Sequence, residues 1–323
     1  MRKVGGKGML GLLLLFVVLI IYTVWDNQRI IVVEQEIVIE HLPEGFDGFT
    51  ILQITDLHER EFGKNQASLI EKVNSVKYDA IVFTGDMLDS NASTNYRPFY
   101  QLIEGIHNKT HALYVPGNAD PNNYFLHPTR PFEKDEFIKG MEHRGVKLLE
   151  SIYTINDEAG AAIQFVEFDI AVKNKEIYLN RPEPNNEAYK AYMDHQKQLF
   201  DEMESLDKSN VTIALSHYPI VDRRIDYMAS SPQFMFRQFD LLLAGHYHGG
   251  QIRLPFIGAL FVPEPWYDRR GILPPRDRVK GLWEYRGIQQ YVSTGLGSSD
   301  AIPMLRFRFL NPPEINILTL KKK

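Results

Sequence analysis

Apolar segments of this sequence repeatedly end in side chains that can bind a metal ion. The stretch LLLAGHYH delivers His246 and His248 directly after a run of leucines, and FTILQITDLH ends in Asp56 and His58. Imidazole and carboxylate groups are ligands that manganese, iron and zinc accept in proteins. A single aspartate or histidine after a strand is ordinarily a turn residue or a hydrogen-bonded core group, so one such segment alone indicates little.

The same arrangement recurs at three further apolar segments, which makes coincidence a poor explanation. Gly85-Asp86 follows AIVFT, Gly117-Asn118 follows HALYVP, and His217 follows VTIALS. In an open α/β sheet, functional side chains gather at the carboxyl ends of the strands. We therefore expect these loops to converge on one metal site, where the neighbouring glycines allow tight turns or close approach of the backbone.

The segments that carry these residues alternate between strand-like and helix-like patterns, which favours the α/β class with layered sheets. Strands are expected over residues 49–55, 80–84, 111–116, 211–216 and 241–244, and helices within 65–77 and 97–108. Between the third and fourth strands the pattern predicts an irregular insertion, with a helix near 135–143, strands near 152 and 163, and an amphipathic helix within 186–206. No repeat and no long linker demands a second domain.

The N-terminus has the pattern of a membrane anchor. Residues 9–25 form an almost uninterrupted apolar run, and Arg2, Lys3 and Lys7 precede it. No small-residue cleavage pattern follows the run, which favours an uncleaved anchor over a secretory signal or a buried core helix. The positive-inside rule then places residues 1–8 in the cytoplasm, residues 9–25 in the membrane and residues 26–323 outside. We expect a single-pass protein of the cell membrane with an extracytoplasmic domain.

Composition narrows the functional classes. The 323 residues are 44% hydrophobic, enough for one large core or two modest ones. The net charge of −5 provides no basic field of the kind that nonspecific nucleic-acid binding requires. Because the chain has no cysteine, thiolate metal sites, cysteine nucleophiles and disulfides are all excluded.

The series DLH, GDMLD, GNAD, SHYP and GHYH resembles the five-block signature of the calcineurin-like metallophosphoesterases, in the same order and spanning residues 56–248. Outside the blocks, the stretches LPEGFDGFTILQITDLH and GHYHGGQIRLP and the C-terminal segment resemble a bacterial membrane-associated subgroup that includes UDP-2,3-diacylglucosamine pyrophosphatase-like enzymes. The resemblance implies a four-layer αββα sandwich, two sheets packed back to back with helices outside, here preceded by one transmembrane helix.

The resemblance also implies a dinuclear centre of two divalent metal ions. It assigns Asp56, His58 and His248 to one ion and Asn118, His217 and His246 to the other, with Asp86 bridging both. Among these, Asp86, Asn118, His217 and His248 are the implied catalytic residues. The expected ions are manganese, iron or zinc, and the expected reaction is hydrolysis of a phosphodiester, pyrophosphate or phosphomonoester bond by a metal-bridging hydroxide.

One position departs from the family pattern. In GNAD, Ala119 follows the predicted ligand Asn118, where the family usually has a histidine that contacts the phosphoryl group and protonates the leaving oxygen. Three interpretations are open: the site is degenerate, another side chain supplies the acid, or the leaving group needs little protonation. His127 and Tyr247 are candidates for that acid, and a structural role is the alternative for each.

The segment FVPEPWYDRRGILPPRDRVKGLW, after the last block, is the candidate for substrate recognition. It brings Trp266, Arg269 and Arg270 onto a proline-rich loop, and aromatic faces with guanidinium groups suit a phosphate attached to a base or sugar. His127 is a further candidate for substrate binding. The alternative for this segment is a solvated surface loop.

Two functions from different classes remain open at this stage. The first is a membrane-anchored phosphohydrolase acting on a phosphorylated small molecule or a lipid-linked substrate. The second is a metal-binding receptor or scaffold that keeps the ligands but lost turnover together with the histidine at position 119.

Overall fold

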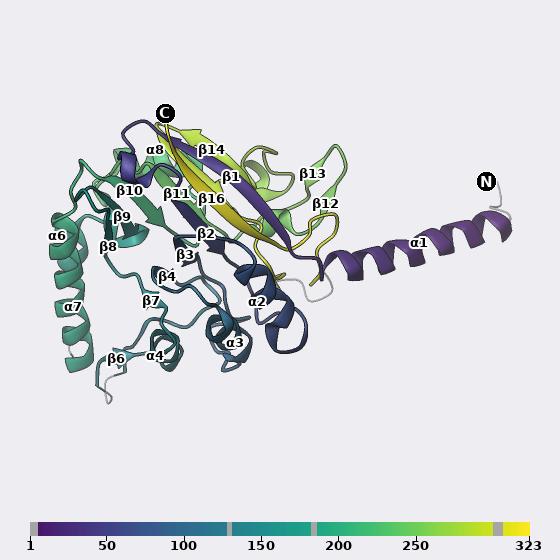
Figure 1. Ribbon diagram of the computed structural model, residues 1–323, viewed down its shortest axis with the longest axis horizontal. Coiled ribbons are helices and arrows are strands. Elements are labelled where there is room, and N and C mark those ends of the chain that lie inside the picture. Colours follow the sequence, from purple (N-terminus) through teal and green to yellow (C-terminus); the bar gives the residue numbers. More distant parts are fainter. Residues whose placement is uncertain (1–5, 128–130, 182–185, 300–305) are drawn as a thin grey trace.

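The computed structural model describes residues 6–127, 131–181, 186–299 and 306–323, and its strands form two large sheets (Figure 1). In the first sheet the order is β1 (Ile31–Ile39), β16 (Glu314–Lys322), β2 (Thr50–Ile54), β3 (Ala80–Phe83), β4 (Ala112–Tyr114), β7 (Lys147–Leu148). In the second it is β14 (Gly281–Tyr285), β15 (Ile288–Val292), β11 (Leu241–Ala244), β10 (Val211–Leu215), β9 (Ala162–Glu167), β8 (Ile152–Asn156). The central strands β2, β3 and β4, and likewise β9, β10 and β11, run parallel.

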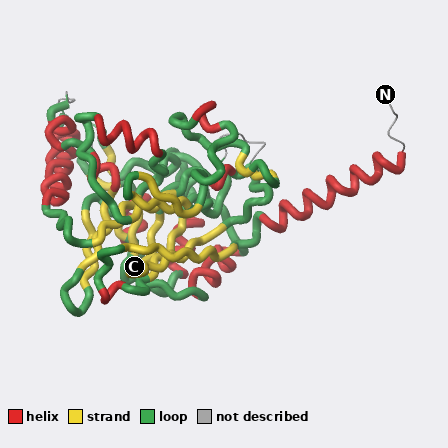
Figure 2. The backbone as a smooth tube through the Cα atoms, turned by 90° about the horizontal axis from the view of Figure 1, so that it is seen from above, coloured by secondary structure: helices red, strands yellow, loops and turns green. Residues whose placement is uncertain are grey.

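The helices and two short hairpins surround these sheets. The helices are α1 (Gly6–Asp26), α2 (Ala67–Asn74), α3 (Arg97–Gly105), α4 (Glu136–His143), α5 (Phe168–Val172), α6 (Lys175–Leu179), α7 (Glu187–Glu204) and α8 (Asp222–Ser230). The hairpins pair β5 (Tyr124–Phe125) with β6 (Glu133–Lys134), and β12 (Arg253–Leu254) with β13 (Gly258–Ala259). Figure 2 shows the strands gathered at the centre, with most helices at the periphery.

Alternation along the strands explains the layering, because successive side chains of a strand point to opposite faces. In β3, Val82 lies in the apolar layer shared by the two sheets, whereas Phe83 packs against the helices on the outer face. Helices α2, α3 and α4 cover the outer face of the first sheet, and α5, α7 and α8 that of the second. The predicted four-layer αββα sandwich is therefore confirmed.

The predicted strands and helices agree with the observed ones to within a few residues, with one correction. The segment between β4 and β10, expected to be an irregular insertion, supplies an edge strand to each large sheet. Its β7 pairs with β4, and its β8 and β9 extend the second sheet next to β10. The strands β1, β14, β15 and β16 were not predicted from the sequence.

Helix α1 projects away from the rest of the protein (Figure 1). Its 19 residues from Gly8 to Asp26 are long and apolar enough to cross a membrane, a property that signal sequences near an N-terminus share. None of the most apolar 18-residue stretch within it is buried, so the alternative of a core helix is wrong. Of the predicted flanking charges, Arg2 and Lys3 lie outside the described residues.

A buried glutamine ties the two sheets together at the carboxyl ends of their strands. Gln53 on β2 is fully buried, and its Nε2 donates hydrogen bonds to Thr84 Oγ1, directly after β3, and to the carbonyl of Ala244 on β11, at 3.0 and 2.9 Å. A buried carbonyl left without a donor would cost roughly 1–3 kcal/mol. This cross-sheet contact fixes the spacing of the loops that follow these strands.

Candidate metal centre

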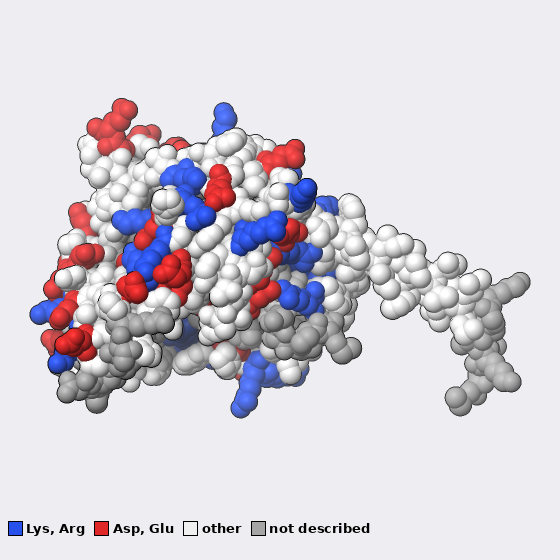
Figure 3. All heavy atoms as spheres, turned by 90° about the horizontal axis from the view of Figure 1, so that it is seen from below, with Lys and Arg blue, Asp and Glu red and all other residues white. Residues whose placement is uncertain are grey.

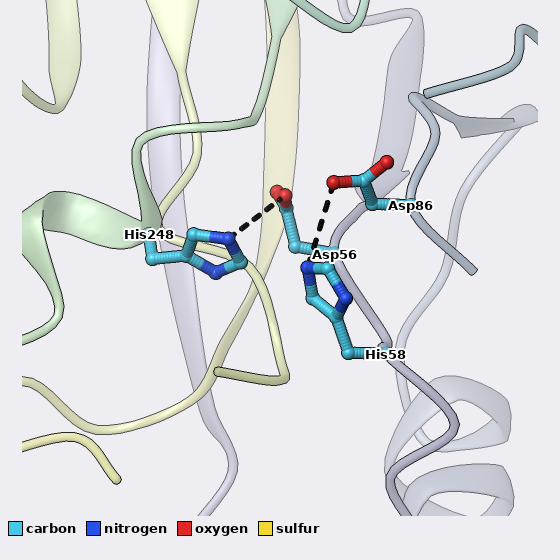
Figure 4. Close-up of side chains that lie close together, drawn as sticks. All are labelled: Asp56, His58, Asp86 and His248. Atoms are coloured by element: carbon cyan, nitrogen blue, oxygen red, sulfur yellow. Dashed lines mark ion pairs between the residues drawn. The ribbon is translucent and has the colours of Figure 1, made fainter. Parts of the chain in front are cut away.

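The loops after the central strands bring six of the seven predicted ligands into two groups, in which every side chain except the partly exposed His246 is buried. The first contains Asp56, His58, Asp86 and His248, and the second contains Asp86, His217 and His246. Within each group, one donor atom from every residue lies within 4.8 Å of the others. Figure 4 shows the first group, with the two imidazoles facing the two carboxylates. Asp86 belongs to both groups, as expected for a bridging ligand.

The backbone adopts an unfavourable conformation at most of these positions. Asp56, His58, Asp86, His246 and His248 all have φ values between 47° and 68°. This left-handed region is uncommon for residues with a side chain, and clusters of such residues are found at functional sites. The sharp turns direct side chains from neighbouring positions into one small volume.

Two glycines allow the loops to approach one another closely. A Cβ atom on Gly117 would lie 2.1 Å from Asp86 Oδ1, and one on Gly245 would lie 2.4 Å from Asp56 Oδ2. Real Cβ atoms do not come this close to other heavy atoms, so a larger residue at either position would displace a carboxylate of the site. The predicted role of the loop glycines is therefore confirmed at these two positions.

The donor atoms are arranged as a divalent ion would require. Donors around one ion with bonds of about 2.1 Å lie roughly 3–3.5 Å apart. Here His58 Nε2 lies 3.5 Å from Asp86 Oδ2, His248 Nε2 lies 3.5 Å from Asp56 Oδ1, and His217 Nε2 lies 3.2 Å from Asp86 Oδ2. His58 Nε2 is also buried without a hydrogen-bond partner, which is costly unless an ion occupies its lone pair. These residues fit a centre of divalent metal ions.

The ring orientation of His217 is fixed by a carbonyl group. Its Nδ1 lies 2.9 Å from the carbonyl oxygen of Thr84, and because a carbonyl can only accept, Nδ1 carries the hydrogen. In the neutral imidazole this leaves the lone pair on Nε2, which faces Asp86 and lies 3.1 Å from His246 Nδ1. Such a contact to the far ring nitrogen is the usual way of orienting a metal-binding histidine.

In the protein without metal, a proton on His217 compensates the buried negative charge. Burial alone would lower the pKa of His217, but the Asp86 carboxylate outweighs burial and raises it to about 9. Burial likewise acts to raise the pKa of Asp86, yet the His217 charge and hydrogen bond lower it below its ordinary value. Burial and neighbouring cations lower the pKa values of His246 and His248, so both rings are neutral and able to bind metal.

Several residues that support the site were not predicted. Arg308 is fully buried and donates hydrogen bonds to the carbonyls of Asn311 and Gly297, and the Asn311 side chain donates to the carbonyl of His248 at 2.7 Å. Asp120 accepts hydrogen bonds from the backbone of the loops after β3 and β4. Among these residues, only Asp120 carried a signal in the sequence, because it lies within the GNAD block.

Tyr218 was not predicted either, although it directly follows the predicted ligand His217. Its ring packs against His246 with 4.5 Å between the ring centres, and 41% of the side chain is exposed. Burial raises the pKa of Tyr218 above its ordinary value, so the phenol keeps its proton at neutral pH. Tyr218 is therefore a protonated, partly exposed phenol beside His246 of the second group.

The remaining residues predicted near the metals lie as follows. Asn118 is exposed, and the backbone places it beside Asp86, because the Ala119 N–H donates to Asp86 Oδ1 at 2.7 Å. Its role as a ligand stays a prediction. Tyr247 is buried and donates a hydrogen bond to Glu264, so it has the structural role rather than that of an acid. His127 is exposed in the loop after β5, and its role also stays a prediction.

The predicted substrate segment lines a groove of its own. Trp266 and Arg269 belong to an open groove of about 600 Å³, and of the described residues that line it none belongs to the two metal-binding groups. Arg278 in the same groove is paired with Asp222 and Asp277. Arg269 and Arg270 are exposed, and neither pairs with a carboxylate within the described part of the chain. Substrate binding by Trp266, Arg269 and Arg270 stays a prediction.

Comparison with known proteins agrees with the geometry of the site. Residues 49–250 match the family model described as calcineurin-like phosphoesterase, which covers more than half of the chain and contains all the grouped side chains. The chain belongs to this family. Together with the buried Asp/His groups, membership indicates a metal-dependent phosphoesterase.

Two bacterial proteins of the family are similar over most of this chain. The uncharacterized metallophosphoesterase YkuE of Bacillus subtilis (strain 168) is 26% identical over 289 residues, covering 87% of this chain and 82% of YkuE. An uncharacterized metallophosphoesterase of Helicobacter pylori (strain J99 / ATCC 700824) is 25% identical, covering 84% of this chain and 60% of that protein. Among solved structures, phosphopantetheinyl hydrolase (PptH) from Mycobacterium tuberculosis aligns with 78% of this chain and 91% of its own, at 15% identity and a TM-score of 0.40.

The proton on His217 predicts how metal binding depends on pH. Because the pKa of His217 rises from 6.5 to about 9, its contribution to the stability of the metal-free protein is complete below pH 6.5 and is lost as the pH rises through about 9. A metal ion needs the neutral ring, so binding at about pH 7.5 should release about one proton, and affinity should increase with pH up to about 9.

Calorimetric titration of manganese into the metal-free full chain, in two buffers of different ionisation enthalpy, measures this release. His217→Gln should bind metal more weakly and without the buffer-dependent heat. His41→Gln, an exposed histidine beside Asp240, should behave as the unmodified protein. Equal heats in both buffers for the unmodified protein would contradict the proton assignment.

Proposed function

We propose that this protein is a membrane-anchored phosphohydrolase with two divalent metal ions, whose catalytic domain lies on the extracytoplasmic side. The observation that supports the proposal most strongly is the position of Asp86, a single carboxylate common to two groups of buried ligands. Two-metal hydrolytic sites hold their ions about 3.5–4 Å apart, a spacing that a shared carboxylate suits.

In this proposal the first ion is held by Asp56, His58 and His248, and the second by His217, His246 and Asn118. When bound, the two ions acidify a water molecule and neutralise the charge of the phosphoryl oxygens. The protein's own backbone groups position the ligands. The carbonyl of Thr84 orients His217, and the N–H of Ala119 holds one oxygen of Asp86 at 2.7 Å so that the other faces His217 and His58. Manganese, iron and zinc all accept this ligand set.

How much protonation a leaving group needs decides which P–O bonds this site can break. With alanine at position 119, the family's usual acid is absent, and Ala119 is buried with its N–H directed at Asp86. The phosphate released from a pyrophosphate bond and the aryl oxide released from an aryl ester leave without much protonation, whereas an alkoxide does not. We therefore propose a substrate with a good leaving group, such as the pyrophosphate linkage that the UDP-2,3-diacylglucosamine pyrophosphatase-like subgroup suggests. The anchor α1 makes a lipid-linked phosphate accessible.

The same alanine also favours a second function. A protein that binds the two ions as a receptor or scaffold would tolerate the loss of the acid while keeping every ligand. Turnover distinguishes the two, because a phosphohydrolase should release product from an activated diester above the rate of the metal ion alone.

Asp86→Asn provides the direct test of the proposed function. An amide carries no charge to hold two cations, so the variant should lose bound manganese and turnover by more than the roughly 10–100-fold that loss of an outer-shell partner typically costs. Turnover of an aryl phosphodiester and metal content per chain would both be measured on the full chain in detergent. Asp79→Asn, a carboxylate that only accepts hydrogen bonds from Thr50, serves as the control and should retain activity. Near-normal turnover in Asp86→Asn would refute the two-metal mechanism.

The missing acid predicts a steep dependence of rate on the leaving group. A general acid typically contributes about 10²- to 10⁴-fold, and most for basic leaving oxygens. In a series of phosphodiesters that differ only in leaving-group pKa, turnover should fall steeply as that pKa rises, and Ala119→His should flatten the slope. Tyr218→Phe should leave the slope unchanged. A shallow slope in the unmodified protein that becomes steep in Tyr218→Phe would instead identify Tyr218 as the acid.

A further inference from the structure

Helix α1 is joined to the catalytic domain without a linker. The residue after the helix, Asn27, is buried, and its side chain holds Arg308 at both backbone groups: Asn27 Nδ2 donates to the Arg308 carbonyl at 2.6 Å, and the Arg308 N–H donates to Asn27 Oδ1 at 2.9 Å. Arg60 donates to the Asn27 carbonyl at 2.7 Å. These contacts fix the direction of α1 relative to the domain, and so fix which face of the domain meets the membrane.

Large apolar side chains are exposed at the end of the domain from which α1 leaves. Figures 1 and 2 both show the β12–β13 hairpin at this end. Its turn carries Phe256, 93% exposed, and Ile257, 49% exposed. The adjoining loop adds Phe261, Ile272 and Leu273, which are about half exposed and are held together by the Phe261–Ile272 bridge. We refer to these five residues as the apolar rim.

The apolar rim and the anchor are connected through one segment of the chain. Arg253, at the start of the hairpin, donates its N–H to the carbonyl of Phe309, and Phe309 donates to the carbonyl of Gln251. Phe309 directly follows Arg308, the residue that Asn27 holds at the end of α1. The same Arg308 and Asn311 contact the loop of the metal ligand His248. Anchor, apolar rim and metal centre are therefore parts of one hydrogen-bonded structure.

Basic side chains flank this end of the protein. Arg253 and Arg276 lie beside Gly258 in the hairpin, and burial together with the nearby Arg253 lowers the pKa of Lys280. Figure 3, which shows the protein from below, has both basic and acidic side chains near the base of α1. Exposed apolar side chains flanked by cations are a composition that binds the interface of a bilayer with anionic lipids. A soluble surface rarely exposes a phenylalanine almost completely beside other apolar groups without a partner.

We propose that the apolar rim is a second membrane contact, inserted into the leaflet from which α1 emerges. It rests on the proposed anchor, and it deepens the proposed function because a second contact holds the domain against the leaflet, whereas one helix alone would let the domain tilt together with α1. The loop of His248 is then held next to the lipid headgroups, a position suited to a phosphate carried by a lipid.

The absence of cysteine allows a direct test on the full chain. Single substitutions Ile257→Cys, Ile177→Cys and Val17→Cys would each carry an environment-sensitive nitrobenzoxadiazole label, in vesicles of phosphatidylethanolamine and phosphatidylglycerol with spin-labelled quencher lipids. Ile177 is the matched control, since it is 39% exposed on α6, which lies at the opposite end of the protein from α1 (Figure 1). Val17 reports insertion of α1.

We expect the label at position 257 to show blue-shifted emission and quenching close to that at position 17, while the label at position 177 behaves as in water. Equal emission and quenching at positions 257 and 177, with position 17 quenched, would overturn the proposal. It would indicate that the apolar rim binds a protein partner instead of the membrane. Lack of quenching at both 17 and 257 would overturn it together with the anchor. Hydrolysis is measured separately, so failure of the phosphohydrolase proposal would not change these spectra.

Discussion

The buried carboxylate of Asp86 is the constraint on which the rest of the site depends. A carboxylate that is only 2% exposed is unfavourable unless cations or donors compensate its charge. In the protein without metal, compensation comes from the proton of His217 and the N–H of Ala119. Two groups of ligands meet at this residue, so two metal ions would replace the proton and bring a larger positive charge to the same place.

The scaffold explains how such a residue can be surrounded on all sides. Asp56, His58 and Asp86 follow strands of the first sheet, whereas His217, His246 and His248 follow strands of the second. Because the sheets pack back to back, the centre lies across their common edge, and neither sheet could form it alone. Gln53 crosses this edge and holds the strand ends at a fixed distance. Bringing the six predicted ligands into so small a volume requires the unfavourable left-handed backbone at five of them and the two closely packed glycines, Gly117 and Gly245.

Much of this could be predicted from the sequence, because ligand residues and strand ends are local signals. The parallel strands β2, β3, β4, β10 and β11 are short apolar runs, and a predicted ligand follows each of them within four residues. Arg308 and Asn311 could not be predicted, because they support His248 from about sixty residues away and belong to a segment without a metal-binding pattern. Tyr247 lies between two ligands in sequence, yet the turn at His246 directs it into the core toward Glu264. Tyr218, by contrast, faces the site because it packs on His246.

The most direct test of the account is the number and position of the metal ions. Crystals of the full chain grown with manganese, with data collected near the manganese absorption edge, would locate each ion by its anomalous scattering. We expect two peaks, one among Asp56, His58 and His248 and one between His217 and His246, with Asp86 contacting both. A single peak, or two peaks that do not share Asp86, would contradict it.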